Sequence, residues 1–319
     1  MTRTRSLAAS LLSFSAAAVL ALVGAAGAHA APSVPGDKSS PSVASAATDS
    51  SGVADYWTPD RMLAAIPGDV LADVAVARGN TSSATSVEQG SAAKVNGTKG
   101  KPTIATRETP VDHIGKVFFS IGNTNYVCSG NAVSSANQST VVTAGHCVNE
   151  GGAFVTNFAF IPAYDNGSAP YGKWTAKALY APAQWTGSGD MQYDTGFAVM
   201  NQLNGKNLTS VVGGSGVTFN QARGLQYTAY GYPQASPFNG KSLFSCAGKA
   251  TNDTINPQFN TQGIRCDMTG GSSGGPWFIG SGPDGLQNSI NSYGYGGSAV
   301  MYGPYWGTVI QEAYFAAAA

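Results

Sequence analysis

The sequence predicts an all-β protein, built as a barrel or a sandwich. Three observations favour this class: many short runs of β-branched and aromatic residues, turn residues between the runs, and almost no helical periodicity. Only 11% of the 319 residues are charged, and Gly, Ser, Thr, Asn and Tyr are abundant. Such a composition is typical of secreted, loop-rich β proteins.

The predicted strands begin with a hairpin. Residues 116–121 and 124–128 form two β-rich runs, and Gly122-Asn123 supplies the turn between them. The chain ends differently, because residues 311–316 predict a short C-terminal helix. Between these ends, further runs predict strands at residues 140–143, 158–161, 196–200, 217–219 and 225–230.

The first 30 residues predict a signal peptide. Arg3 and Arg5 give a positive start, an apolar run spans residues 7–23, and Ala28-His29-Ala30 offers a small-x-small cleavage site. No later run is long and apolar enough to cross a bilayer, so we expect a secreted protein without a membrane contact. Residues 31–110 then predict a pro-segment and linker, and residues 111–319 the main domain.

One helix is predicted inside the pro-segment. Thr58 can cap it, Pro59 suits its first position, and Asp60 adds an acidic first turn. Met62, Leu63 and Ile66 would give it an apolar side, and Pro67 should end it. Residues 79–101 predict a linker. An ordinary disordered tail is the alternative to a pro-segment with a small docking helix.

Cysteine number and charge limit the possible partners. The four cysteines, Cys128, Cys147, Cys246 and Cys266, predict two disulfides in an exported protein, with three possible pairings. A zinc site is the competing interpretation, but there is no C-x-x-C pair and one of the three histidines lies in the signal, so we expect no metal. Seventeen basic residues balance seventeen acidic ones, and nothing indicates nucleic acid.

Three segments carry residues typical of nucleophilic catalysis. Ser273 lies in a glycine-rich loop (residues 269–277) whose backbone N–H groups can converge on one point. His146 completes an apolar strand and adjoins Cys147, and an imidazole is the usual base for a serine hydroxyl. Asp194 begins a predicted strand between them in chain order and suits the role of orienting carboxylate.

The competing residues rank lower. Asp165 and Asp190 lie in Gly/Ser-rich loops that do not lead directly into a strand, and His113 near the linker is interpreted as a surface residue. A strand-capping carboxylate is the alternative role for Asp194.

Together, TAGHC (143–147), YDTGFAV (193–199) and TGGSSGGP (269–276) resemble the chymotrypsin-like (trypsin-like) serine endopeptidases, closest to a secreted bacterial branch near the glutamyl-endopeptidase relatives. The resemblance runs from about residue 115 to 315. It implies two six-stranded antiparallel β-barrels, a short C-terminal helix, protein or peptide substrates, a monomer and no cofactor.

The resemblance also implies residue roles. Ser273 would be the nucleophile, His146 the base and Asp194 its partner, with the N–H groups of Gly271 and Ser273 as the oxyanion hole. Cys128 with Cys147 matches the family's disulfide beside the histidine, which leaves Cys246 with Cys266. Ser292 and Gly294 resemble the strand that pairs with substrate, and Gly303 the far wall of the specificity pocket.

Two departures from the family pattern bear on activation and specificity. Ser272 stands where many relatives have an Asp that pairs with a new N-terminus, so we expect activation by removal of an inhibitory pro-segment. Asp267 stands where the trypsin branch keeps the acid that binds Arg or Lys. The residue is either a receptor for a basic side chain or a structural carboxylate. Glutamyl specificity is weakened, because Asn291 stands where that branch tends to place a His.

Two other functions compete with the protease. A catalytically inactive homologue could act as a binding module, although this chain keeps all three triad residues. A serine esterase would need the alternating helices of an α/β-hydrolase, which the sequence lacks.

Overall fold

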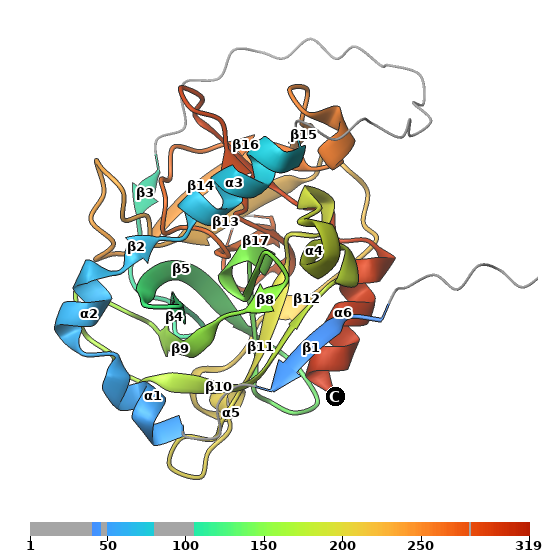
Figure 1. The fold of residues 1–319 in the computed structure, drawn as a ribbon. Helices are drawn as coiled ribbons and strands as arrows, with labels where there is room; N and C mark the ends of the chain where they lie inside the picture. The colour runs from blue at the N-terminus through green and yellow to red at the C-terminus, as the bar shows by residue number, and fades with distance from the viewer. Residues whose placement is uncertain (1–39, 46–49, 80–104, 281) are drawn as a thin grey trace, which may run out of the picture. The chain divides into compact units, whose positions relative to one another are not determined.

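The computed structural model describes residues 40–45, 50–79, 105–280 and 282–319 (Figure 1). The predicted signal peptide and nearly all of the predicted linker lie outside the described residues. Within the described part of the chain, no helix has both the length and the apolar character that a membrane crossing needs.

The first half of the main domain is a closed antiparallel barrel. Its strands follow the order β10-β11-β6-β5-β4-β9, and Trp174 and Thr175 of β10 pair with Phe160 and Ala159 of β9 to close the ring. Aromatic and aliphatic side chains, among them Val117, fill the interior. The six strands are β4 (Ile114–Ile121), β5 (Thr124–Val133), β6 (Thr140–Thr143), β9 (Thr156–Pro162), β10 (Trp174–Ala181) and β11 (Gly196–Met200).

The predicted hairpin is confirmed. Ile121 pairs with Thr124, so Gly122 and Asn123 alone form the turn, and Gly122 has a φ of +57°. The predicted runs at 140–143 and 196–200 coincide with β6 and β11, and residues 158–161 lie within β9.

Two sheets make up the second half. One has the order β12-β18-β17-β13-β14-β3 and the other β15-β16-β20-β19. The Cys246–Cys266 disulfide joins β14 of the first sheet to the residue after β16 of the second. The strands are β3 (Thr106–Arg107), β12 (Gly216–Val217), β13 (Gln226–Gly231), β14 (Phe244–Lys249), β15 (Thr251–Asn252), β16 (Gln262–Arg265), β17 (Pro276–Ile279), β18 (Leu286–Ile290), β19 (Tyr293–Gly294) and β20 (Val300–Gly303).

Helices are few and short among the described residues of the main domain. The predicted C-terminal helix is confirmed as α6 (Thr308–Ala318), which packs against β10 and β11 of the first half. The predicted all-β class with a short C-terminal helix is therefore confirmed. The remaining elements are η1 (Gly145–Cys147), β7 (Asn149–Glu150), β8 (Ala153–Phe154), α4 (Ala183–Ser188), η2 (Met191–Tyr193), α5 (Leu208–Val212) and η3 (Pro257–Phe259).

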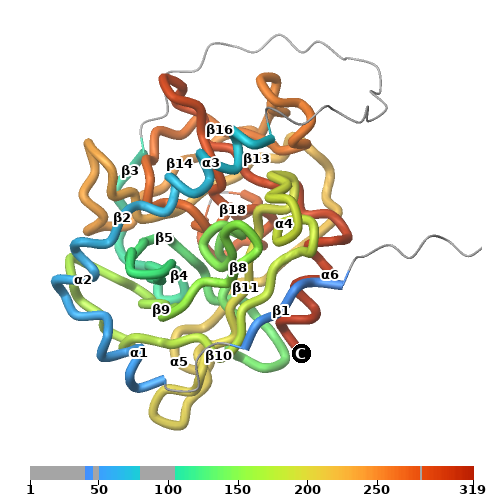
Figure 2. Tube along the Cα trace, in the orientation of Figure 1, coloured from blue at the N-terminus to red at the C-terminus, as the bar shows by residue number. Residues whose placement is uncertain are grey.

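The segment before residue 80 packs on both halves. The strand β1 (Ser42–Ser45) extends the first-half sheet at β10, and β2 (Ile66–Pro67) pairs with β5. Three helices, α1 (Ser50–Tyr56), α2 (Pro59–Ala64) and α3 (Asp69–Gly79), belong to the same segment. Figure 2 shows the segment as the blue tube, with α3 beside the strands of the second half.

The helix predicted after Thr58 is confirmed as α2. Thr58 Oγ1 accepts a hydrogen bond from the Arg61 N–H at 3.3 Å, and the helix ends before Pro67. The predicted apolar side is wrong for two of its three residues. Met62 is buried, but Leu63 is 71% exposed and Ile66 is 43% exposed. The helix is too short to turn three such positions toward the barrel, since Ile66 already lies in β2.

Buried polar groups join the two halves. Lys116 of β4 is only 2% exposed, and its Nζ donates to Oε1 of Gln234 and the carbonyl of Gly240, both at 3.0 Å. Burial lowers the pKa of Lys116 to about 7. His113 is half-buried rather than a surface residue, because its Nδ1 lies 2.7 Å from Oδ1 of the buried Asn131.

Candidate active site

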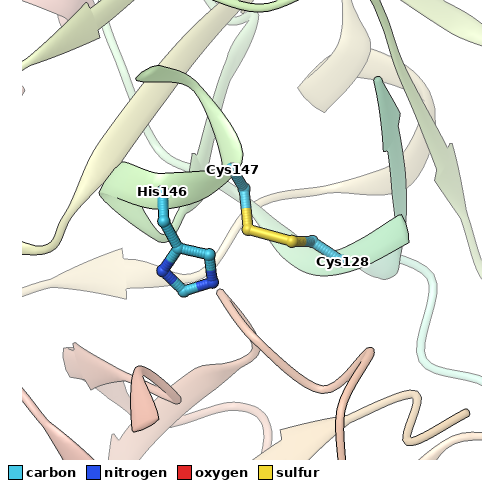
Figure 3. A group of neighbouring side chains, drawn as sticks. All are labelled: Cys128, His146 and Cys147. Carbon is cyan, nitrogen blue, oxygen red and sulfur yellow. A yellow bond between two sulfur atoms is a disulfide. The ribbon is translucent and has the colours of Figure 1, made fainter. Parts of the chain in front are cut away.

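A disulfide holds His146 at the end of the first barrel. His146 lies on η1, directly after β6, and the neighbouring Cys147 is bonded to Cys128 of β5 (Figure 3). This is the pairing that the family resemblance implied. The sulfurs are engaged in the disulfide, so the group Cys128, His146 and Cys147 offers no thiolate to a metal ion.

Asp194 holds the imidazole at two points. Its Oδ2 lies 2.9 Å from Nδ1 of His146, and its Oδ1 accepts the backbone N–H of the same residue at 2.9 Å. Ser292 donates its hydroxyl to Oδ2 at 2.5 Å. All three residues are buried. A carboxylate in these contacts fixes the ring orientation and the tautomer with a proton on Nδ1.

The two rival carboxylates serve other contacts. Asp190 caps η2 by accepting the Gln192 N–H at 3.0 Å. Asp194 follows at the end of this short turn, two residues before β11 begins. Asp165 lies in a tight turn with Ser168. Neither has a described hydrogen bond to His146.

The electrostatics of the pair favour a charged carboxylate. Burial alone would lower the pKa of His146, but the adjacent Asp194 carboxylate outweighs it and the net pKa is raised. For Asp194, burial acts to raise the pKa. The imidazole charge and the hydrogen bonds from His146 and Ser292 outweigh that effect, so the pKa of Asp194 is lowered.

The loop around Ser273 needs glycine at two positive φ angles. Gly271 has a φ of +96° and Gly274 one of +80°, and a Cβ on Gly274 would lie 2.1 Å from Oγ1 of Thr143. Ser272 donates both its N–H and its hydroxyl to the carbonyl of Thr269. In the described hydrogen bonds, the N–H groups of Gly271 and Ser273 have no acceptor. Two unengaged donors in one loop can receive an oxyanion.

Backbone contacts bring this loop to the His146 side. The carbonyl of Ser273 accepts the N–H of Ser129 at 2.7 Å, and Ser129 follows Cys128, the disulfide partner of Cys147. On the other side, the Gly274 N–H donates to the carbonyl of Asn291 at 2.7 Å. Ser292, next in the chain, is the residue that donates to Asp194.

Asn291 supports the loop. Its amide donates to the carbonyls of Tyr230 and Ser272, and its Oδ1 accepts the Trp277 indole N–H at 2.7 Å. The side chain is fully buried and both of its N–H groups are used, so it offers no donor to a substrate.

A cavity of about 600 Å³ opens beside Ser273. The predicted pocket residues Asp267, Ser292 and Gly294 line it, but Gly303 does not. A Cβ on Gly303 would lie 2.2 Å from the carbonyl oxygen of Ile290, so this glycine allows close packing of β20 on β18. The Oδ1 of Asp267 accepts the Ala105 N–H at 2.7 Å.

The helix α3 enters the same cavity. Asp69, Ala72 and Asp73 line it together with Ser273, and the Asp69 carboxylate approaches so closely that a Cβ on Gly270 would clash with it. The Oδ1 of Asp69 and Nε2 of His146 are both buried without a partner among the described residues. Burial chiefly raises the pKa of Asp69, the charge of Asp73 adds to this, and His146 opposes it.

Sequence reasoning missed α3 and its three cavity residues. The helix buries Leu71, Ala72, Ala75 and Val76, two pairs of positions four residues apart. Val70 and Val74 are apolar as well but exposed, so the apolar residues of this segment do not form one helical stripe in the sequence. The surface that the helix covers could not be predicted either, because no local pattern encodes it.

Two solved structures that cover about two thirds of the chain are proteases. The chain is similar to the protease Anisep from Arthrobacter nicotinovorans, with 70% identity, a TM-score of 0.66, and coverage of 67% of this chain and 99% of that one. It is also similar to the thermostable serine protease AL20 from an extremophilic microorganism, with 53% identity over 65% of this chain and 97% of that one and a TM-score of 0.63.

Two further relatives have a lower sequence identity or match a shorter part of the chain. A Glu endopeptidase shares the fold, with a TM-score of 0.54 and 18% identity over 69% of this chain and 99% of that one. A curated relative, an extracellular metalloprotease of Bacillus subtilis (strain 168), is 35% identical over 80 residues, a quarter of each chain. The chain therefore spans only about a quarter of that relative's length. No family model matches the chain.

Proposed function

This chain belongs to the chymotrypsin-like serine proteases, and we propose that Ser273, His146 and Asp194 are the catalytic triad of this serine endopeptidase. The observation that carries the proposal is the two-point contact of Asp194 with His146. A structural ion pair needs no such tautomer control, whereas a general base does.

The proposed reaction is acyl transfer. The Ser273 hydroxyl attacks the scissile carbonyl while Nε2 of His146 takes its proton, and the oxyanion binds the N–H groups of Gly271 and Ser273. His146 then gives the proton to the leaving amine, which leaves an ester on Ser273. Water, deprotonated by His146, hydrolyses the ester and restores the enzyme. The unpartnered Nε2 of His146 and the unengaged N–H groups support these roles.

We propose that the enzyme is made as an inhibited precursor and secreted. The presence of Asp69, Ala72 and Asp73 in the cavity of Ser273 supports inhibition, because a peptide substrate would need the same space. Two disulfides and the sequence of residues 1–30 support export. The expected substrates are proteins or peptides, and the expected state is a monomer.

A fluorescent phosphonate that reacts with activated serines tests both proposals. We expect rapid labelling of the processed enzyme, slow labelling of the intact precursor, and none of Ser273→Ala. Equal labelling of Ser273→Ala would refute the assigned nucleophile. No labelling of any form would instead favour a binding module, and equal labelling of precursor and processed enzyme would refute inhibition by α3.

A further inference from the structure

The described chain resumes at Ala105, already fixed to the second half. Thr106 and Arg107 form β3, which pairs with β14, and the Glu108 N–H donates to the carbonyl of Leu243 at 2.8 Å. Ala105 is only 9% exposed and packs in the apolar cluster of the Cys246–Cys266 disulfide. The main domain is therefore anchored from Ala105 onward, several residues before its predicted start at residue 111.

The nitrogen of Ala105 meets a carboxylate of the catalytic cavity. The Ala105 N–H donates to Oδ1 of Asp267 at 2.7 Å, and Asp267 lines the cavity beside Ser273. The other charged residues of the described lining are Asp69 and Asp73, both on α3. Once α3 leaves, Asp267 is the one charged residue left among the described residues that line this cavity.

We propose that maturation cuts the chain immediately before Ala105 and that the new α-ammonium pairs with Asp267. This inference rests on the proposed activation by removal of the pro-segment. In the hydrolysis, water adds across the peptide bond between residues 104 and 105 and the C–N bond breaks. Residue 104 keeps the carboxylate, and the Ala105 nitrogen takes a proton and becomes an ammonium.

The cut strengthens a contact that already exists. A neutral amide donor becomes a charged one with three N–H groups, and charge-assisted hydrogen bonds are about twice as strong as neutral ones. Ser272 has no charge with which to hold a new N-terminus, whereas Asp267 does. The ammonium also neutralises Asp267, so this carboxylate does not select substrates with Arg or Lys before the cut bond.

Chain length supports the same boundary. The Anisep structure matches 67% of this chain and 99% of its own. That share of 319 residues is as long as the segment from about Ala105 to Ala319. The relative's crystallised chain is therefore about as long as an enzyme that begins near Ala105.

The first test is the N-terminus of the processed enzyme. Intact-mass measurement and N-terminal sequencing of enzyme matured from the full precursor should give Ala105 as the first residue. A different first residue in an active enzyme overturns this inference and leaves the proposed function standing. Absence of peptide hydrolysis from every processed form would overturn both.

The second test couples the N-terminus to Asp267. A site-specific cleavage sequence placed before Ala105 yields enzymes that begin with Ala105 or with one added Gly, each with Asp267 or Asp267→Asn. We expect the added Gly and the Asn to lower kcat/KM by about 10-fold each, and by no more when combined, since both remove one charge-assisted bond. Asp284→Asn, an exposed carboxylate of the same half, is the matched control and should have no effect.

The coupling separates this pairing from a structural or substrate-binding role. If the two losses in kcat/KM multiplied in the double variant, the pairing would be overturned. An added Gly that had no effect would overturn it as well. So would a selective loss of cleavage after Arg and Lys in Asp267→Asn, which would make Asp267 a receptor for basic side chains.

Discussion

The two halves of the active site are held by different means. In the first half, one carboxylate fixes His146 through two hydrogen bonds, and a disulfide anchors the adjacent residue. In the second half, backbone bonds, two glycines at positive φ and the buried Asn291 amide fix the loop of Ser273. A side-chain pair therefore controls the first half, whereas the second depends chiefly on the backbone conformation of the loop. A change in the first should remove activity alone, and a change in the second should remove activity and stability together.

The largest expected effect is on Asp194. Asp194→Asn keeps the shape but lets His146 adopt the wrong tautomer, so we expect kcat to fall about 10⁴-fold, the size that the same change has in this family's template mechanism. The free energy of unfolding should change by less than about 2 kcal/mol. Peptide hydrolysis and urea unfolding measure the two, and a stability loss that parallels the activity loss would contradict the comparison.

Gly274→Ala should act through the fold. The new Cβ would lie 2.1 Å from Oγ1 of Thr143 and 2.5 Å from the carbonyl of Ser129, at a φ of +80°. We expect a loss of about 3 kcal/mol or more in the free energy of unfolding. Urea unfolding in the Ser273→Ala background, which prevents self-digestion, measures it.

Gly187→Ala is the control for that loss. Gly187 lies in α4, and a Cβ there meets nothing within 4 Å. Its substitution should be neutral or stabilise the protein by up to about 1 kcal/mol. If both alanine variants were equally stable, the loop would not depend on glycine.

The buried Lys116, which joins the two halves by hydrogen bonds, should make stability depend on pH. Its pKa in the folded protein is about 7, below its ordinary value of 10.5, so between these values the unfolded chain binds more protons and stability rises with pH. Compared with Lys116→Met, the parent should gain up to about 1.4 kcal/mol per pH unit between pH 7 and 10. Unfolding at pH 7.5, 8.5 and 9.5 in the Ser273→Ala background checks this, and parallel curves would mean that folding does not lower the pKa of Lys116.

The smallest expected effect is on the acid side of the pH–activity curve. As the proposed base, His146 must be neutral, so activity should fall as pH drops through its raised pKa. The charge of Glu150 helps to raise that pKa. Glu150→Gln should therefore move the acid limb by about 0.3 pH units toward lower pH. Glu312→Gln, exposed on α6, should not move it. A pH-independent kcat/KM between pH 5 and 8 would contradict the role of His146.

Within the proposed pro-segment, the sequence predicted α2 but missed α1 and α3, and α3 is the helix that lies in the cavity. The cap, proline and acidic turn of α2 are local signals, and they predicted its start at Pro59. The burial of α3 comes from contact with β19 and η2, elements more than a hundred residues away. Local signals say where a helix begins, but not which surface it covers.

The sequence by itself determined the β-rich class, the hairpin, the C-terminal helix and the membership of His146, Asp194 and Ser273 in one family pattern. Strand periodicity, turn residues and short motifs are local, so they can be read without a fold. Only the tertiary structure decided that Asn291 supports the loop and that Gly303 does not line the cavity. It also decided that Asp267 accepts a hydrogen bond from Ala105 and that α3 lies beside Ser273. These contacts join residues far apart in the chain, and the packing of the two halves alone determines which of them meet.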